Sequence, residues 1–232
     1  MSKQQKVGAI ITAAGNSQRM GGIDKIFTLL GGKPLIARTV GVFQQCEVID
    51  QIIIVLNQQN LERGKQLVAD QGWNKVSDIC PGGERRQDSV VSGLNHLKDC
   101  HWVIIHDGAR PLVTEKLIRS GLAEAEDSGG AIAAVPVNDT IKMVDSDRFV
   151  IGTPPRQNLS AVQTPQVFRF EIIDTAYRQA QAEVTDDATL VEQNGHKVKL
   201  YTGSYDNIKV TTPADLALAE ILWQNNQSRP DS

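Results

Sequence analysis

The sequence has little cysteine, few aromatic residues, no large excess of either charge and no long apolar run. Its three cysteines, Cys46, Cys80 and Cys100, are widely spaced, with no Cys-x-x-Cys pair and no histidine at metal-ligand spacing. This argues against a disulfide framework and against a zinc site. It fits a reducing compartment, so we expect a cytoplasmic protein.

Charge and hydropathy patterning argue against two classes of partner. The formal net charge is −3, and basic residues gather only in short pairs such as Arg85-Arg86, which we interpret as solvated. No stretch approaches the roughly 20 apolar residues that a membrane span requires, and the polar N-terminus lacks the apolar core of a signal peptide. We therefore expect neither a nucleic acid nor a membrane as a partner.

Apolar runs alternate with helical patterns along most of the chain. Four nearly continuous apolar runs indicate buried strands: residues 7–11, 52–56, 102–105 and 131–135. Residues 61–69 and the segment that follows a Thr114 cap have helical periodicity. The alternation predicts an α/β fold with a doubly wound, Rossmann-like, mostly parallel sheet, and the length predicts one domain over residues 1–232.

One region interrupts this alternation between Pro136 and Leu159. Two short extended runs, residues 140–144 and 148–151, flank the turn signal Asp145-Ser146-Asp147. We predict an inserted β-hairpin arm at about 136–159. Because a lone hairpin is marginal in water, the arm is expected to pack against something, and a second subunit is one candidate.

After the arm the α/β pattern resumes. Residues 170–181 and 186–193 are predicted helices, and residues 197–201 and 207–211 are predicted strands. Thr212-Pro213-Ala214-Asp215 has the composition of a helix start, with Thr as the cap and Pro at the first helical position.

The loop after the first strand is the most informative segment. The loop from Ala13 to Gly22 is rich in small residues and contains Arg19, and Lys25 closes it. Backbone N–H groups and two cations in this position suit a polyanion such as a nucleotide triphosphate. Neither a Walker A loop nor a dinucleotide fingerprint fits the spacing. An ordinary turn with two solvated cations is the alternative.

Other polar residues follow later strands. Asp107 comes directly after a buried strand and before a glycine, a position suited to a metal or a ribose, or else to a simple turn. Gly82-Gly83 precede a helix in which Ser89 is placed to read a base edge. Asp206 and Lys209 put an acid and a base near a late strand, with an exposed ion pair as the alternative.

Seven segments occur in one fixed order across nearly the whole chain. They are AAGNSQRMGG with Lys25, PGGERRQDSV, HDGARP, PVNDTIK, QTPQVF, TDDATLVE and YDNIKVTTPADLALAE. Short loops match singly by chance, but seven in order do not. Together they resemble the 2-C-methyl-D-erythritol 4-phosphate cytidylyltransferases.

The resemblance implies a nucleotidyltransferase core, CTP as co-substrate and Mg²⁺ as the ion. In this family an oxygen of the polyol phosphate attacks the α-phosphorus of CTP in line. The products are 4-diphosphocytidyl-2-C-methyl-D-erythritol, an isoprenoid precursor of the non-mevalonate pathway, and pyrophosphate. Catalysis of this kind is mostly positioning and electrostatic stabilisation.

The resemblance also implies a role for each matching residue. Arg19 and Lys25 are expected to stabilise the transition state, and Arg156 and Lys209 to hold the attacking phosphate. The expected acceptor-binding residues are Arg110, Thr140, Thr164 and Asp206. The nucleotide-binding set is Ala13, Ala14, Gly15, Gly82, Gly83, Glu84, Ser89 and Asp107. Asp107 and Asp206 are the candidate magnesium ligands.

The arm resembles the dimerisation arm of the family, which would carry Thr140 and Arg156 into a shared site, so a homodimer is expected. The chain departs from the family pattern at two places, with Ser17 for a glycine and Asp24-Lys25-Ile26 for a Pro-Lys-Gln triplet. Neither change touches Arg19 or Lys25, so activity is expected to survive. The length is accounted for without a fused cyclodiphosphate synthase domain.

Four alternatives stay open at this point. A cytidylyltransferase for ribitol 5-phosphate or another polyol phosphate would share the CTP loop and differ in the acceptor pocket. A nucleotide-sugar glycosyltransferase typically needs an Asp-x-Asp motif at a strand end, and Asp107-Gly108-Ala109 lacks the second acid. A non-catalytic nucleotide-binding regulator need not retain Arg19, Lys25 and Lys209 together. An NAD-dependent oxidoreductase conflicts with the broken fingerprint.

Overall fold

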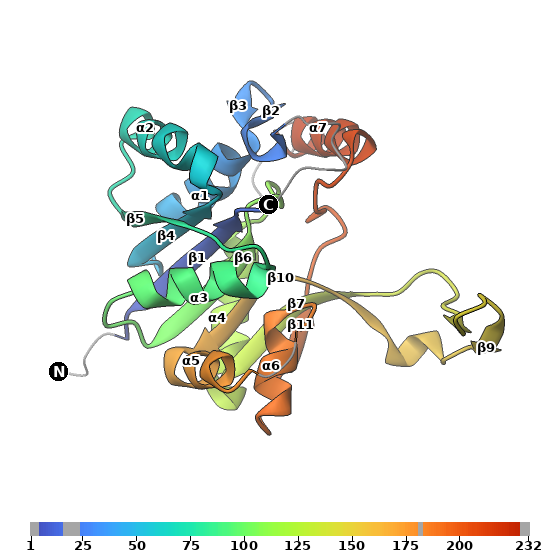
Figure 1. The fold of residues 1–232 in the computed structure, drawn as a ribbon. Coiled ribbons are helices and arrows are strands. Elements are labelled where there is room, and N and C mark those ends of the chain that lie inside the picture. Colours follow the sequence, from blue (N-terminus) through green and yellow to red (C-terminus); the bar gives the residue numbers. More distant parts are fainter. Residues whose placement is uncertain (1–4, 16–23, 181–182, 228–232) are drawn as a thin grey trace.

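The computed structural model describes residues 5–15, 24–180 and 183–227 of the chain (Figure 1). A seven-stranded sheet forms its centre. The strand order is β11 (Lys199–Thr202), β7 (Gly130–Pro136), β10 (Ser160–Arg169), β6 (Trp102–Asp107), β1 (Val7–Ala13), β4 (Gln51–Leu56) and β5 (Val76–Pro81). Strand β10 runs antiparallel to both of its neighbours, and the other pairs are parallel. The predicted doubly wound, mostly parallel sheet is confirmed.

The four apolar runs form the strands on which the sheet is built. Val7–Ala13 lies between β4 and β6, with Ala9 opposite Ile52 on one side and Ile104 on the other. Strands covered on both faces bury nearly every side chain, which is why these runs are continuous rather than alternating. The register brings the carboxyl ends of β1 and β6 side by side, with Thr12 paired to Asp107.

Helices cover both faces of the sheet. One face packs against α1 (Leu35–Gln45), α2 (Leu61–Gln71) and α4 (Glu115–Ser128), and its core includes Ile11 and Phe43. The other face packs against α3 (Arg86–His96), α5 (Phe170–Arg178) and α6 (Asp187–Gln193), and its core includes Ile10 and Phe168. Adjacent residues of β1 thus face opposite layers, as the period of a strand requires.

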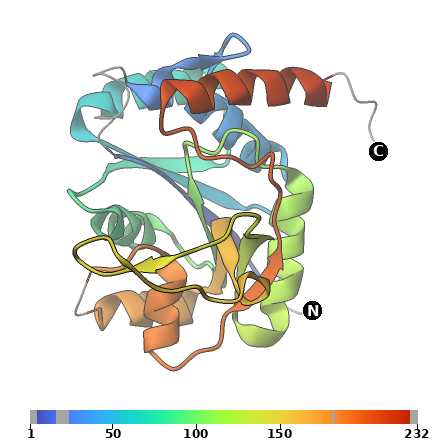
Figure 2. The same cartoon turned by 90° about the vertical axis from the view of Figure 1, so that its right-hand side faces the viewer.

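The last helix, α7 (Pro213–Gln227), packs on the short β2 (Leu29–Leu30) and β3 (Lys33–Pro34) ribbon rather than on the sheet, as Figures 1 and 2 both show. Its predicted start is confirmed, because the Asp215 carboxylate accepts bonds from the Thr211 and Thr212 amides while the Thr212 hydroxyl accepts from the Asp215 amide. Thr114 likewise caps α4 by accepting from the Leu117 amide at 3.2 Å.

The predicted hairpin is present as an arm that projects away from the sheet (Figure 1). Its paired strands, β8 (Met143–Val144) and β9 (Val150–Gly152), are shorter than the predicted runs. From Pro136 to Val162, a range the structure describes throughout, no side chain is buried. Phe149 is 71% exposed and Ile151 is 63% exposed.

One strand prediction was wrong. Residues 207–211 form no strand and do not join the sheet. This segment crosses the loop after β6 instead, where the Val210 amide bonds to the Ala109 carbonyl and the Arg110 guanidinium bonds to the Asn207 carbonyl. The backbone of a loop and the Arg110 side chain therefore bond to this segment in place of a neighbouring strand, and periodicity does not distinguish the two cases.

Candidate active site

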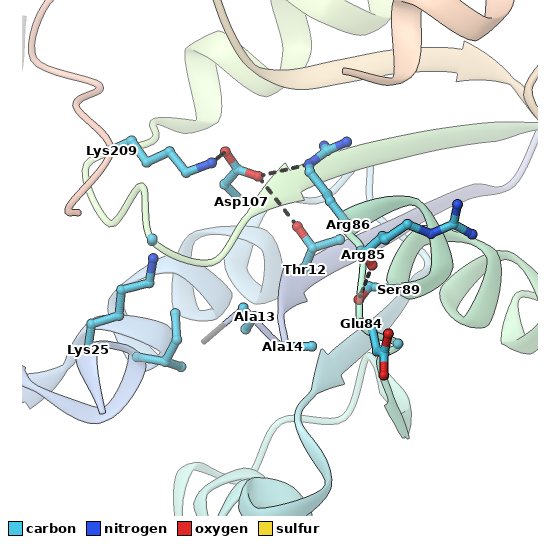
Figure 3. Close-up of a pocket in the computed structure, with 14 residues that line it drawn as sticks. Thr12, Ala13, Ala14, Lys25, Glu84, Arg85, Arg86, Ser89, Asp107 and Lys209 are labelled. Carbon is cyan, nitrogen blue, oxygen red and sulfur yellow. Dashed lines mark hydrogen bonds and ion pairs between the residues drawn. The ribbon is translucent and has the colours of Figure 1, made fainter. Parts of the chain in front are cut away.

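A pocket opens where the carboxyl ends of β1 and β6 meet the start of α3 (Figure 3). Its described lining residues are Thr12, Ala13, Ala14, Gly15, Lys25, Ile26, Gly83, Glu84, Arg85, Arg86, Ser89, Asp107, Ala109 and Lys209. Most of the nucleotide-binding set inferred from the sequence therefore lines one cavity. This is the edge at which parallel α/β sheets bind ligands.

One rim of the pocket requires glycine. A Cβ on Gly82 would collide with Ala14 and Ser89, and a Cβ on Gly83 would collide with Asp88. Gly82 therefore allows the loop before α3 to approach the end of β1 closely, and Gly83 allows it to pass close to the first turn of α3. Gly83 is among the lining residues of the pocket and Gly82 is not. The result is a slot beside Ala14, Gly83 and Ser89.

Asp107 is a buried carboxylate surrounded by cations. Lys209 Nζ lies 2.8 Å from Asp107 Oδ2, and Arg86 Nε lies 3.5 Å from Oδ1 (Figure 3). Arg110 Nε lies 3.6 Å from Oδ2. Burial by itself would raise the pKa of Asp107, but Lys209 and Arg86 outweigh it and hold that pKa well below its ordinary value. Asp107 is therefore ionised at neutral pH.

Arg86 is held from behind by a second buried acid. Its two terminal nitrogens lie 2.8 and 2.7 Å from the oxygens of Asp187, which is fully buried and also accepts from the Tyr177 hydroxyl. Burial opposes the charge on Arg86, yet Asp187 raises its pKa above the ordinary value. The guanidinium is thus fixed with its Nε toward Asp107.

Our interpretation of Arg85-Arg86 as a solvated pair was half wrong. Both line the pocket, but Arg85 is exposed and pairs with Asp88, whereas Arg86 pairs with the buried Asp187. Asp187 belongs to a segment that contains a helix cap, but the capping residue is Asp186. The partner of Arg86 lies 101 positions away along the chain, so no local signal identifies the pair.

Thr164 and Arg110 lie behind Asp107. The Thr164 hydroxyl accepts from the Asp107 amide at 3.1 Å and contacts His106 Nδ1 at 3.0 Å. His106 is fully buried, and burial lowers its pKa to about 4. Within the described residues, Arg110 Nε and Asn207 Oδ1 are buried without a hydrogen-bond partner. Buried polar atoms of this kind are expected to meet a ligand or water.

Lys25 enters the pocket from the short 3-10 turn η2 (Lys25–Phe27). Asp24 fixes this turn, because its carboxylate accepts from the Ile26 amide at 3.2 Å and from the Asn60 amide group at 2.6 Å. Ile26 is 2% exposed and extends into the core. The departure from the Pro-Lys-Gln pattern thus leaves Lys25 on a fixed support.

Three of the predicted site residues that the structure describes lie elsewhere, and a fourth cannot be placed. Arg19 is outside the described residues. Asp206 is partly buried on the loop that carries Lys209 but is not among the described lining residues. Thr140 and Arg156 are exposed on the arm, where Arg156 Nη1 donates to the Asn138 carbonyl at 2.6 Å. The other predicted site residues that the structure describes lie in or next to the pocket, and the arm residues do not.

Few of the described carboxylates near the pocket could bind a metal ion. Among the residues it describes, no cluster of three or more His, Cys, Asp or Glu side chains could hold an ion. Asp107 and Glu84 are the carboxylates among the described lining residues. Mg²⁺ often takes one or two protein carboxylates together with substrate phosphates, so a single ionised Asp107 fits such an ion.

A doubly wound sheet with an ionised aspartate among cations and a glycine-containing loop in one pocket is the arrangement expected of a nucleotidyltransferase. The family model for 2-C-methyl-D-erythritol 4-phosphate cytidylyltransferase matches residues 7–225. The chain belongs to this family and is a cytidylyltransferase.

Named relatives agree with this assignment. A 2-C-methyl-D-erythritol 4-phosphate cytidylyltransferase of Dehalococcoides mccartyi is 54% identical, covering 98% of this chain and 100% of its own. One of Alkaliphilus oremlandii is 45% identical over 98% and 99% of the two chains. The crystal structure of 4-diphosphocytidyl-2C-methyl-D-erythritol synthase from Anaerococcus prevotii superposes with a TM-score of 0.85 at 30% identity, covering 95% and 97% of the chains.

None of the helices in the described part of the chain combines the length and the apolar character needed to cross a bilayer.

Proposed function

We propose that this pocket transfers CMP from CTP to 2-C-methyl-D-erythritol 4-phosphate, releasing pyrophosphate. The observation that carries the proposal is the placement of Asp107 between Lys209 and Arg86, in the same pocket as Gly83. An acid, two cations and a backbone slot suit the ribose, the phosphates and the base of one nucleotide. The bond that forms joins an acceptor phosphate oxygen to the α-phosphorus, and the bond that breaks releases pyrophosphate.

The cytosine is proposed to lie in the slot formed by Ala14, Gly83 and Ser89, with Ala13, Gly15, Gly82 and Glu84 around it. Backbone groups in a narrow slot present fixed donors and acceptors. They select cytosine over uracil because the wrong base leaves buried groups unpaired. Asp107 then lies within reach of the ribose and the phosphates.

Charge that develops on the α-phosphate is proposed to be stabilised by Arg19 and Lys25. Lys25 supports this role because it lines the pocket on the fixed η2 turn. Preorganised cations lower the barrier without reorganising during the reaction. The acceptor phosphate is assigned to Lys209 and Arg110, which lie where the loop carrying Lys209 crosses the loop after β6. Asp206, an acid on the same loop, is assigned to the polyol part of the acceptor rather than to its phosphate. Thr164 acts on this side through the Asp107 amide.

Mg²⁺ is proposed to bind Asp107 together with the phosphate oxygens of CTP. When bound, the ion would neutralise part of the phosphate charge. Lys209 and Arg86 keep Asp107 ionised. Lys209 would have to leave its 2.8 Å ion pair with Oδ2 for that oxygen to bind the ion.

The active form is proposed to be a homodimer joined by the arm. Phe149, Val150 and Ile151 are more than half exposed on the hairpin, and apolar residues gathered in this way mark an interaction surface. Arg156 and Thr140 of one copy would then reach the acceptor phosphate in the other. Residues 1–232 would form one domain, with the arm at about 136–159 as its excursion.

Calorimetric titration of CTP and of UTP, each with Mg²⁺, tests the nucleotide assignment. CTP is expected to bind at least about tenfold more tightly than UTP, because the slot matches one base edge. Equal affinity for both nucleotides would contradict the assignment of the slot.

A further inference from the structure

The loop that carries Lys209 is bonded to the root of the arm through one side chain. The Tyr205 hydroxyl donates to the Pro136 carbonyl at 2.8 Å and lies 3.2 Å from Asn138 Oδ1. Pro136 is the last residue of β7, and Asn138 lies at the start of the arm. Tyr205 therefore bridges the loop after β11 and the point where the arm leaves the sheet.

Asn138 is also bonded to the returning limb of the arm. Arg156 Nη1 donates to the Asn138 carbonyl at 2.6 Å. Both limbs of the arm thus meet at Asn138, one through the backbone and the other through a guanidinium. A contact that fixes Asn138 also fixes the position from which Arg156 extends.

The loop that carries Tyr205 is hydrogen-bonded to the central sheet on both sides of this residue. The Gly203 amide donates to the Ala134 carbonyl at 2.8 Å, and Gln163 Nε2 donates to the Ser204 carbonyl at 2.9 Å. Asn207 Nδ2 donates to the Thr164 carbonyl at 2.8 Å. The loop on either side of Tyr205 is therefore anchored to the sheet, so Tyr205 holds the arm root to a fixed reference.

Burial does not explain the placement of Tyr205, which is 54% exposed. Its ring adds little to the core, so the two polar contacts at its tip are what distinguish it from an ordinary surface residue. Replacement by phenylalanine would keep the ring and remove only these contacts.

We propose that Tyr205 is a positioning residue, which sets the direction of the arm and, through Asn138, the position of Arg156. The inference rests on the proposed function, in which Arg156 of one copy serves the acceptor phosphate in the other. The loop of Tyr205 also carries Lys209. Tyr205 therefore links the site of its own copy to the arm that would complete the site of the partner copy. Tyr205 would thus act on acceptor binding and not on CTP binding.

The test compares Tyr205→Phe with Tyr201→Phe. Tyr201 loses the same hydroxyl, but its bond is to the buried Pro165 carbonyl and not to the arm. Tyr205→Phe is expected to raise KM for the polyol phosphate about two- to tenfold, the range of one neutral hydrogen bond, with KM for CTP unchanged. Tyr201→Phe is expected to leave the ratio of the two KM values unchanged. Equal changes of both KM values in Tyr205→Phe would overturn the proposal.

Hydrogen exchange gives a readout that needs no substrate. Amides at the arm root, residues 137–140 and 156–159, are expected to exchange faster in Tyr205→Phe than in the unmodified protein. Unchanged exchange there would overturn the proposal even if activity fell. Absence of turnover with 2-C-methyl-D-erythritol 4-phosphate in the unmodified protein would contradict the proposed function instead. A double variant with Asn138→Ala is expected to be no worse than the more severe single variant, and additive effects would contradict the link through Asn138.

Discussion

Lys209 places its ammonium group 2.8 Å from the carboxylate of Asp107 and joins the loop after β11 to the end of β6. The two side chains differ in solvent exposure: that of Lys209 is 40% exposed and that of Asp107 is 9% exposed. Asp107 is thus fixed by its surroundings, whereas Lys209 retains access to the pocket. This asymmetry suits a lysine that exchanges one anionic partner for another when substrate binds.

Lys25→Ala is expected to lower kcat by about 10²-fold or more, because it removes a preorganised cation from the reacting phosphates. Circular dichroism and the melting temperature should be unchanged. Lys33→Ala, on the exposed β3, is the matched control and should retain full activity. A Lys25→Ala enzyme with normal turnover would overturn the proposed role.

Asp187→Asn tests the support of Arg86. Loss of one partner from a buried ion pair typically costs about 3–5 kcal/mol, so the free energy of unfolding should fall markedly. In the folded fraction, kcat/KM for CTP should also fall, because Arg86 is no longer held toward Asp107. Asp186→Asn, which changes the neighbouring cap, is the control, and an equal loss of kcat/KM for CTP there would contradict this account.

The cap of α7 predicts an acid-dependent loss of stability. Hydrogen bonds from Thr211 and Thr212 lower the pKa of Asp215 to about 2, below its ordinary value near 4. A lowered folded-state pKa stabilises the fold above the unfolded value, and this stabilisation is lost as the pH falls from about 4 toward 2. Asp215→Ala should therefore cost about 1 kcal/mol at pH 6, measured by urea unfolding, and much less at pH 2. An equal cost at both pH values would exclude the ionised cap.

The arm predicts a dimer that single substitutions weaken. Phe149→Ser is expected to shift the mass measured by light scattering toward the monomer, because it removes the most exposed large apolar side chain of the hairpin. Leu200→Ser, which replaces an exposed leucine on β11, is the control. A monomer in the unmodified protein would contradict the arm interface directly.

Much of the fold follows from the sequence because each element has a local signal. Buried strands such as Ile52–Leu56 are continuous apolar runs, and caps such as Thr114 use a side chain three positions from its partner. The segment 207–211 was predicted wrongly because an extended run has the same pattern whether it pairs with a strand or with Arg110.

The site residues likewise divide into those with a local sequence signal and those without one. Asp107 and the glycine rim could be predicted because they follow strands or precede a helix. Arg86 could not, because Asp187 decides its orientation from a distant helix and nothing in the neighbourhood of Arg86 separates it from Arg85. The role of Tyr205 could not be predicted either. Its partners, Pro136 and Asn138, are distant in the sequence and come close to Tyr205 only in the folded chain.

Pyrophosphate release with CTP and Mg²⁺, measured with 2-C-methyl-D-erythritol 4-phosphate and with ribitol 5-phosphate as acceptor, is the decisive test of the proposed reaction. Release is expected with the methylerythritol acceptor, with little or none from ribitol 5-phosphate. Preference for ribitol 5-phosphate, or release with neither acceptor, would overturn the proposed reaction.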